Sequence, residues 1–423
     1  MSFYPRVSFY ESILKKSKKD KQVNNILEKA KRLEFISLED LGILIRSCDN
    51  SEIKNDIFET AKYITEKVFG DRIVIFAPLY YSNICRNDCV YCGFKRSRKI
   101  KRIRLDEEKF RFEVRELINK GFKSIEIVSG EDPFFDAKKV GNLVKIARSE
   151  GVRQILCNIG VFDDIKSYIT LKASELNSFI LFIETYHPTY YSKYHPKNTH
   201  KGDYRKRLAA YDLAAQAGIT NLGLGILLGL YDWKFELLAI VDHARYLIEK
   251  YNVIISISVP RLMPISGIIK DIPFKVTNED FLLFVGLLRI ALPFAFFGIS
   301  TRESREVRRK ALAIGGTSTS AESYTGVGGY YRKYTTKQFP NYTVSLLQTI
   351  NDVIRIGKIP SFCTTCSELN LNGKDFYNLA QSGKLKEGCY INSILSLEEF
   401  YSKKLYKRHI VYDFSSDKIL IVH

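Results

Sequence analysis

The chain has 423 residues, 45% of them hydrophobic and 26% charged, a composition that predicts a folded core and excludes wholesale disorder. Its formal net charge is +18, but the lysines are scattered along expected helix faces and no arginine-rich arm occurs, so we do not expect nucleic acid as a partner. Residues 1–21 lack the apolar segment of a signal peptide. We therefore expect a cytoplasmic protein.

A change of pattern at residue 71 divides the chain. Residues 1–70 carry apolar residues at helical spacing, with Ser37 and Asp40 expected at the start of one helix. After residue 71 short apolar runs alternate with amphipathic segments. The expected strands are 72–80, 124–130, 153–160, 179–185, 221–229, 253–260 and 296–301, with an eighth within 311–323. The clearest helices are 106–121, 137–151, 204–218 and 234–251. Eight β–α units predict a (β/α)8 barrel whose site lies at the C-terminal ends of its strands.

One stretch, Phe281–Ser300, is long and apolar enough to imitate a membrane span. Arg289 and Pro293 interrupt it, so we expect a buried helix followed by a buried strand and no membrane association. Residues 346–423 form a C-terminal segment that ends in a small hairpin within 401–423. The expected units are therefore a helical region (1–70), the barrel (71–345) and this segment (346–423).

The chain has eight cysteines, most of them in two groups. The first group follows the first strand in a C-x3-C-x2-C pattern and contains Cys85, Cys89 and Cys92. The second group contains Cys363, Cys366 and Cys389. Without a secretion signal, grouped cysteines indicate metal ligands rather than disulfides, whereas the isolated Cys48 and Cys157 are expected to be core thiols. Three thiolates leave one position open in a cubane cluster, and the alternative is a zinc site with a distant fourth ligand.

Polar residues at two other strand ends are further candidates. Gly130 and Glu131 follow the second strand, where Glu131 or Asp132 could instead cap a helix. Glu184 ends an apolar strand and needs a partner when buried, either a ligand hydroxyl or a structural arginine or lysine.

The first cysteine loop resembles the cluster motif of the radical SAM enzymes. The resemblance implies a [4Fe–4S] cluster whose open iron is chelated by S-adenosylmethionine. It implies that Tyr91 packs near the adenine and that Gly130-Glu131 orients the methionyl amine, with Ser129 where a first glycine is often found. It also implies that Glu184 binds the ribose.

More extended motifs resemble the tyrosine lyase group of this superfamily and cover roughly residues 70–400: FAPLYYSNICRNDCVYCGF, ETYHPTYYSKYHP, DYRKRL, GLYDW, ISVPRLMP, STRES, SYTGVGGY and PSFCTTC. This resemblance implies cleavage of the Cα–Cβ bond of tyrosine, or another aromatic amino acid, to p-cresol and dehydroglycine. It places Arg207 at the S-adenosylmethionine carboxylate, against the alternative of a surface ion pair with Asp203. Arg302 is expected to hold the substrate carboxylate, assisted by Ser323. GVGGY could simply be a tight glycine turn. Asn158 and Ser258 are expected to face the cavity, Asn158 as one of the cofactor-binding residues.

The second cysteine group is similar to that of the [FeFe]-hydrogenase maturase branch (HydG type) and is lacking in the 2-iminoacetate synthase branch (ThiH type). It implies a second [4Fe–4S] cluster at the far end of the barrel and formation of CO and cyanide, against the alternative of a structural zinc or cluster. Two departures from the maturase pattern weaken the prediction of CO and cyanide formation. Ile255 stands where that pattern has a histidine that helps to hold a labile iron, and Glu322 replaces a glycine. The segment SELNLNGKDF also differs from the basic run expected there.

Three alternatives to a maturase therefore stay open: a 2-iminoacetate synthase for thiamine biosynthesis, a divergent paralogue, and a non-catalytic iron–sulfur carrier or scaffold. As an enzyme the chain would need a reductant protein such as a ferredoxin or flavodoxin.

Overall fold

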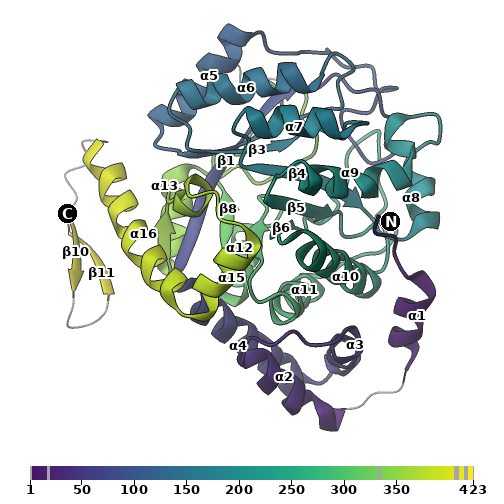
Figure 1. The fold of residues 1–423 in the computed structure, drawn as a ribbon, viewed down its shortest axis with the longest axis vertical. Coiled ribbons are helices and arrows are strands. Elements are labelled where there is room, and N and C mark those ends of the chain that lie inside the picture. Colours follow the sequence, from purple (N-terminus) through teal and green to yellow (C-terminus); the bar gives the residue numbers. More distant parts are fainter. Residues whose placement is uncertain (1, 17–19, 332–334, 404–408, 414–417, 423) are drawn as a thin grey trace.

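The computed structural model describes residues 2–16, 20–331, 335–403, 409–413 and 418–422 (Figure 1). Eight parallel strands form a closed barrel in chain order, because β1 pairs with β2 on one side and with β8 on the other. The strands are β1 (Arg72–Ser82), β2 (Ser124–Ser129), β3 (Gln154–Asn158), β4 (Ser178–Glu184), β5 (Asn221–Ile226), β6 (Ile254–Ser258), β7 (Phe296–Ile299) and β8 (Ser318–Ser320). The predicted (β/α)8 barrel is confirmed, including the eighth strand within 311–323.

Helices surround the barrel (Figure 1). They are α5 (Glu107–Asn119), α6 (Ala137–Ser149), α7 (Ile165–Ala173), α8 (Pro188–Tyr194), α9 (Tyr204–Gln216), α10 (Trp233–Tyr251), α11 (Asn278–Ala291) and α12 (Arg305–Ile314), with a 3-10 turn η2 (His200–Gly202) before α9. Several expected strands, such as 221–229 and 253–260, are shorter in the structure because their last residues leave the sheet to form loops at the C-terminal ends of the strands.

The apolar stretch Phe281–Ser300 is a buried helix and strand, as predicted. Arg289 lies fully buried in α11, where its guanidinium donates to the carbonyl oxygens of Pro293 and Ala295 at the turn before β7 and of Gly315. Backbone oxygens thus bind both Nη atoms of this charge, while its Nε has no hydrogen-bond partner within the described part of the chain. Within the described ranges, no helix has both the length and the apolarity needed to cross a membrane.

The N-terminal region is helical, as predicted. It consists of α1 (Val7–Lys15), η1 (Asp20–Gln22), α2 (Val23–Lys31), α3 (Leu38–Ser47) and α4 (Ser51–Phe69). Ser37 and Asp40 form a capping box at the start of α3. α4 packs against α11 and leads directly into β1. These helices therefore belong to the layer that covers the barrel.

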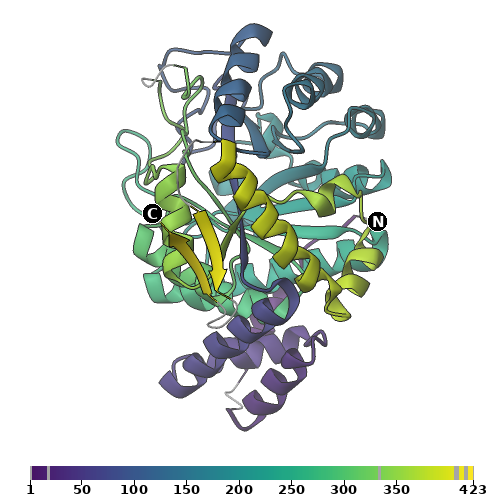
Figure 2. The same cartoon turned by 90° about the vertical axis from the view of Figure 1, so that its left-hand side faces the viewer.

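The C-terminal segment contributes a strand that the sequence did not predict. β9 (Ile359–Ser361) pairs in parallel with the first three residues of β1, Arg72 opposite Ile359. The helices of this segment are α13 (Leu346–Arg355), α14 (Thr365–Glu368), α15 (Gly373–Gln381) and α16 (Lys384–Lys403). α16 lies against β9 and crosses the outside of the barrel (Figure 2). The expected hairpin is formed by β10 (His409–Asp413) and β11 (Lys418–Val422). The division into three units stays a prediction.

Candidate active site

The first cysteine group lies in the loop that leaves the C-terminal end of β1, the end of the barrel where the site was predicted. Burial raises the pKa of the Cys85 thiol to about 11 and also raises that of Cys92. Backbone N–H groups point at both sulfurs, from Asn87 to Cys85 Sγ at 3.5 Å and from Phe94 to Cys92 Sγ at 3.4 Å. A metal ligand must be a thiolate, and buried thiolates need cationic charge beside them. The donor set therefore fits a cluster whose irons supply that charge.

A glycine brings the end of β2 against this loop. A Cβ on Gly130 would lie 2.4 Å from the carbonyl oxygen of Ile84 and 3.0 Å from Cys85 Cβ, closer than backbone atoms allow. Glycine is therefore required at this position, and the next residue, Glu131, reaches the site beside the cysteines.

Glu131 is buried and has three polar partners. Its oxygens lie 2.8 Å from Arg207 Nη1, 2.7 Å from Asn87 Nδ2 and 2.9 Å from His200 Nδ1. Burial alone would raise the pKa of this carboxyl, but the hydrogen bond of His200, the charge of Arg207 and the amide of Asn87 outweigh it and hold the pKa well below its usual range. Glu131 is thus a carboxylate. The helix-capping alternative is wrong, because Asp136 caps α6 and Asp132 pairs with Arg104.

Arg207 is buried on α9 and does not form the surface ion pair considered as an alternative. Its Nε donates to the carbonyl oxygen of Phe182 at 2.6 Å and its Nη1 to Glu131, while Asp203 caps the helix. Among the described residues no partner bonds to Nη2, and Arg207 lines the cavity. One arm of the guanidinium is therefore available to a ligand carboxylate.

Glu184 ends β4 in a strained conformation, with φ +73° and an irregular register against β5. Lys201 supplies the structural partner that a buried carboxylate needs, its Nζ lying 2.5 Å from Oε1. Lys201 Nζ also lies 5.9 Å from the centre of the Tyr91 ring. Ribose binding by Glu184 stays a prediction, and a ligand hydroxyl would have to share the carboxylate with Lys201.

Tyr91 is buried between the cysteine loop and α8. Its hydroxyl lies 2.8 Å from His195 Nε2, and His195 Nδ1 lies 2.8 Å from the carbonyl oxygen of Tyr191. Burial holds the pKa of His195 well below its usual value, so the ring is neutral. Nδ1 must then donate to the carbonyl, and Tyr91 donates to Nε2. The phenol ring is fixed in one orientation beside the cysteines.

Arg302 follows β7 and lacks an acceptor. Its Nε has no hydrogen-bond partner within the described part of the chain, and its Cζ lies 3.4 Å from the centre of the Phe339 ring. Burial lowers the pKa of this guanidinium. Arg302 is half-buried and lines the cavity without an anion beside it, so the geometry fits a ligand carboxylate in that cavity.

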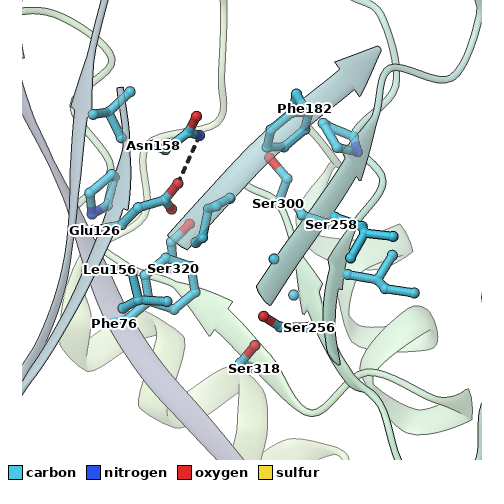
Figure 3. A pocket seen from close by; sticks show the side chains of 18 of the residues that line it. Phe76, Glu126, Leu156, Asn158, Phe182, Ser256, Ser258, Ser300, Ser318 and Ser320 are labelled. Atoms are coloured by element: carbon cyan, nitrogen blue, oxygen red, sulfur yellow. Dashed lines mark hydrogen bonds between the residues drawn. The ribbon is translucent and has the colours of Figure 1, made fainter. Parts of the chain in front are cut away.

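A cavity of about 330 Å³ runs through the barrel and is lined by both cysteine groups. TIM barrels usually fill this space with layers of bulky apolar side chains. Here the side of β6–β8 presents serines instead, including Ser256, Ser258, Ser300, Ser318 and Ser320 (Figure 3). The interior is therefore open, with a row of hydroxyl groups in an otherwise largely apolar wall.

The second cysteine group lines the end of this cavity at which β1 begins. Arg72 Nε donates to Cys389 Sγ at 3.0 Å, and Cys363 and Cys366 line the same end of the cavity. Burial raises the pKa of Cys366 to about 11. Three thiols around one buried cation are a donor set that fits a second anionic cluster, which stays a prediction.

Three other predicted cavity residues do line it: Asn158, Ser258 and Ser323. Ser323 Oγ donates to Ser320 Oγ at 2.9 Å. Ile255, by contrast, is fully buried in β6 and is not among the residues that line the cavity, although its neighbours Ile254 and Ser256 are. The polar group that β6 presents there is the Ser256 hydroxyl.

Glu322 shows how the chain accommodates a residue where the maturase pattern has glycine. Its φ is +52°, a conformation that favours glycine. Lys120 Nζ at 2.9 Å and the backbone N–H of Leu346 at 2.9 Å bind its carboxylate. These contacts offset the backbone strain.

Four residues with a place in the site were not predicted: Arg72, Glu126, His200 and Lys201. The available signals were weak, since Arg72 opens an apolar strand and Glu126 is a lone acid in SIEIVSG. Across the described ranges, no group of three or more His, Cys, Asp or Glu side chains is arranged to hold a metal ion. In a cubane the thiolates bind different irons and need not converge on one ion.

Comparison with known proteins places these features in context. Residues 79–244 match the radical SAM superfamily, and residues 258–356 match the biotin and thiamin synthesis associated domain. The 2-iminoacetate synthase of Salmonella typhimurium is 32% identical over 313 residues, 72% of this chain and 80% of that protein.

Two solved structures are similar over nearly the whole chain. A crystal structure of HydG, a maturase of the [FeFe]-hydrogenase, is 36% identical with a TM-score of 0.90, covering 94% of this chain and 89% of that one. HydG from Carboxydothermus hydrogenoformans is 32% identical with a TM-score of 0.81, covering 94% and 91%.

Proposed function

Since the chain belongs to the radical SAM superfamily, within its tyrosine-lyase-type group of HydG and the 2-iminoacetate synthases, we propose that it cleaves tyrosine to p-cresol and dehydroglycine and delivers dehydroglycine to a second cluster for hydrogenase maturation. Membership of the superfamily implies a [4Fe–4S] cluster, S-adenosylmethionine, a small-molecule substrate and a reductant. A ferredoxin or flavodoxin is the proposed reductant.

The residues at the upper end of the cavity, where β1 ends, divide the binding tasks. Cys85, Cys89 and Cys92 would hold the cluster, which with S-adenosylmethionine supplies hydrogen-atom abstraction from the substrate. Glu131, an acceptor beside the cysteines, would bind the methionyl amine, and the free arm of Arg207 would bind its carboxylate.

The adenosyl group and the substrate have their own proposed partners. Tyr91 would pack near the adenine and Glu184 would bind the ribose. Arg302 would hold the substrate carboxylate, with Ser323 lining the same space. Holding the amino acid by its carboxylate fixes which of its atoms faces the cofactor.

The observation that carries the maturation half is the cavity. The same cavity is lined by the first cysteine group and by Cys363, Cys366 and Cys389, which supports transfer of a small product between them inside the barrel. Arg72 supports an anionic second cluster at that end.

A second candidate is 2-iminoacetate synthesis for thiamine formation. It is favoured by the 32% identity to the Salmonella enzyme and by the match of residues 258–356. In that case the fragment would leave the barrel, and the second cysteine group would have a structural role.

The test is an anaerobic reaction of the reconstituted protein with dithionite, S-adenosylmethionine and tyrosine. The proposal expects 5′-deoxyadenosine and p-cresol by mass spectrometry, together with CO trapped by deoxyhaemoglobin. The two lyase products without CO or cyanide would favour 2-iminoacetate synthesis. Deoxyadenosine without p-cresol would point to another amino acid. Neither product from protein with a full iron content would favour the carrier alternative.

A further inference from the structure

The middle of the barrel is hollowed by small residues. Gly223 and Gly298 line the cavity on β5 and β7, and Ser256 and Ser318 line it on β6 and β8. A Cβ on Gly298 would have its nearest contact at 3.6 Å, with Ser318 Oγ, so this side of the interior has room. The opposite side carries an acid, Glu126 of β2 (Figure 3).

Glu126 has few partners for a carboxyl in this position. Asn158 Nδ2 donates to its Oε1 at 3.0 Å, and within the described ranges no other hydrogen bond or ion pair of this side chain is found. Burial raises its pKa, because no cation lies near enough to offset the loss of water. Glu236, a glutamate that is buried outside the cavity, receives two donors, from Thr185 and Tyr186.

The chemistry around Glu126 indicates what would complete it. A carboxyl with a free oxygen is best satisfied by a nitrogen that donates a hydrogen bond, and most strongly by an ammonium or protonated imine. Across the cavity the serine hydroxyls are donors suited to a carboxylate. Phe76, Leu156 and Phe182 contribute apolar walls to the same cavity (Figure 3).

We propose that Glu126 and Asn158, facing the serines of β6 and β8, form a binding site for a small α-amino or α-imino acid midway along the barrel. This inference rests on the proposed function, which supplies such a molecule in dehydroglycine. Glu126 binds the nitrogen and the serine hydroxyls bind the carboxylate. The site holds the fragment between the two cysteine groups and selects it against molecules without a nitrogen.

Glycine is the stable probe for this site. Isothermal titration calorimetry of the anaerobic reconstituted protein, without reductant, measures the affinity for glycine. Acetate, which has only the carboxylate, and methylammonium, which has only the ammonium group, are titrated for comparison. Glu126→Gln replaces the charged acceptor and should weaken the binding of glycine about ten- to hundredfold, the usual effect of losing a hydrogen bond to a charged group. The affinity for methylammonium should fall by a similar factor, and the affinity for acetate should change less than twofold. Glu236→Gln makes the same chemical change outside the cavity and should leave glycine binding within twofold.

Glycine can also occupy the upper site, so the titrations are repeated in Arg302→Met protein. Binding that remains there and still depends on Glu126 supports the inference. Equal affinity in wild type and Glu126→Gln, or no binding to wild type, overturns it. If Glu126→Gln fails to fold, Asn158→Ala removes the donor that positions Glu126 and should show the same loss. Formation of p-cresol from tyrosine by the wild type is scored separately, so failure of the proposed function is distinguishable from failure of this site.

Discussion

Arg302→Met separates a ligand-binding arginine from a structural one. The guanidinium of Arg302 has the Phe339 ring at 3.4 Å but no hydrogen-bond acceptor for Nε in the described part of the chain. Methionine keeps the apolar stem and the contact with the ring, and it removes only the charge. The folded protein therefore loses little, whereas a bound amino acid loses the partner of its carboxylate.

The effect of Arg302→Met on stability should be much smaller than its effect on substrate binding. Loss of the cation–π contact costs about 1–2 kcal/mol. The substitution also relieves the cost of holding an unpaired charge in a half-buried position, so the free energy of unfolding should stay nearly level. Removing one member of a buried guanidinium–carboxylate pair costs about 3–5 kcal/mol, which corresponds to a fall in kcat/KM of about 100- to 5,000-fold.

Thermal unfolding and the rate of p-cresol formation from tyrosine measure both effects in the same preparations. Arg305→Met is the matched control, because Arg305 pairs with Asp352 on α13, away from the cavity. It should leave kcat/KM within twofold. An Arg302→Met protein that is destabilised by more than about 2 kcal/mol while keeping kcat/KM within fivefold would show that Arg302 is structural.

Four further substitutions test other parts of the molecule. Cys85→Ala should abolish cleavage of S-adenosylmethionine, whereas Cys389→Ala should keep p-cresol formation and lose only the downstream product; loss of cleavage in both would contradict two separate sites. Gly298→Val should fold, because its Cβ would lie 3.6 Å from Ser318 Oγ, an ordinary van der Waals contact, yet it should obstruct the cavity, so p-cresol should persist while CO falls at least tenfold. Burial raises the pKa of the Glu113 carboxyl from 4.5 to about 7, so the native state keeps a proton that the unfolded chain releases. Stability should therefore fall by about 3 kcal/mol as pH rises from 4.5 to 7. In Glu113→Gln, unfolding by denaturant should lack this loss, and an unchanged pH dependence would assign it elsewhere.

The barrel was predictable because its signals are local. Each strand shows as a short apolar run, and the amphipathic segments between them fix a parallel arrangement. β9 escaped prediction because it has three residues, one of them Pro360, and becomes a strand only through pairing with β1. That pairing requires β1 to extend beyond β8, which depends on tertiary structure.

The site was predictable where a motif is contiguous. The cysteine loop and Gly130-Glu131 are short segments whose spacing carries the information. Arg72 and Glu126 were missed because their roles depend on which side of a strand faces the interior and on residues hundreds of positions away. The sequence marks Ile255 as standing at an iron-binding position of the maturase pattern, but in the structure its side chain does not line the cavity.

The length of β1 has a consequence for how the two ends of the molecule communicate. Arg72 begins this strand beside the second cysteine group, and Ser82 ends it at the first. Its eleven residues span about 33 Å at about 3.3 Å per residue. A hydrogen-bonded strand neither shortens nor bends about a hinge, so the two cysteine groups stand at a constant separation. They can influence each other through a molecule that travels the distance, and not through one domain closing upon another.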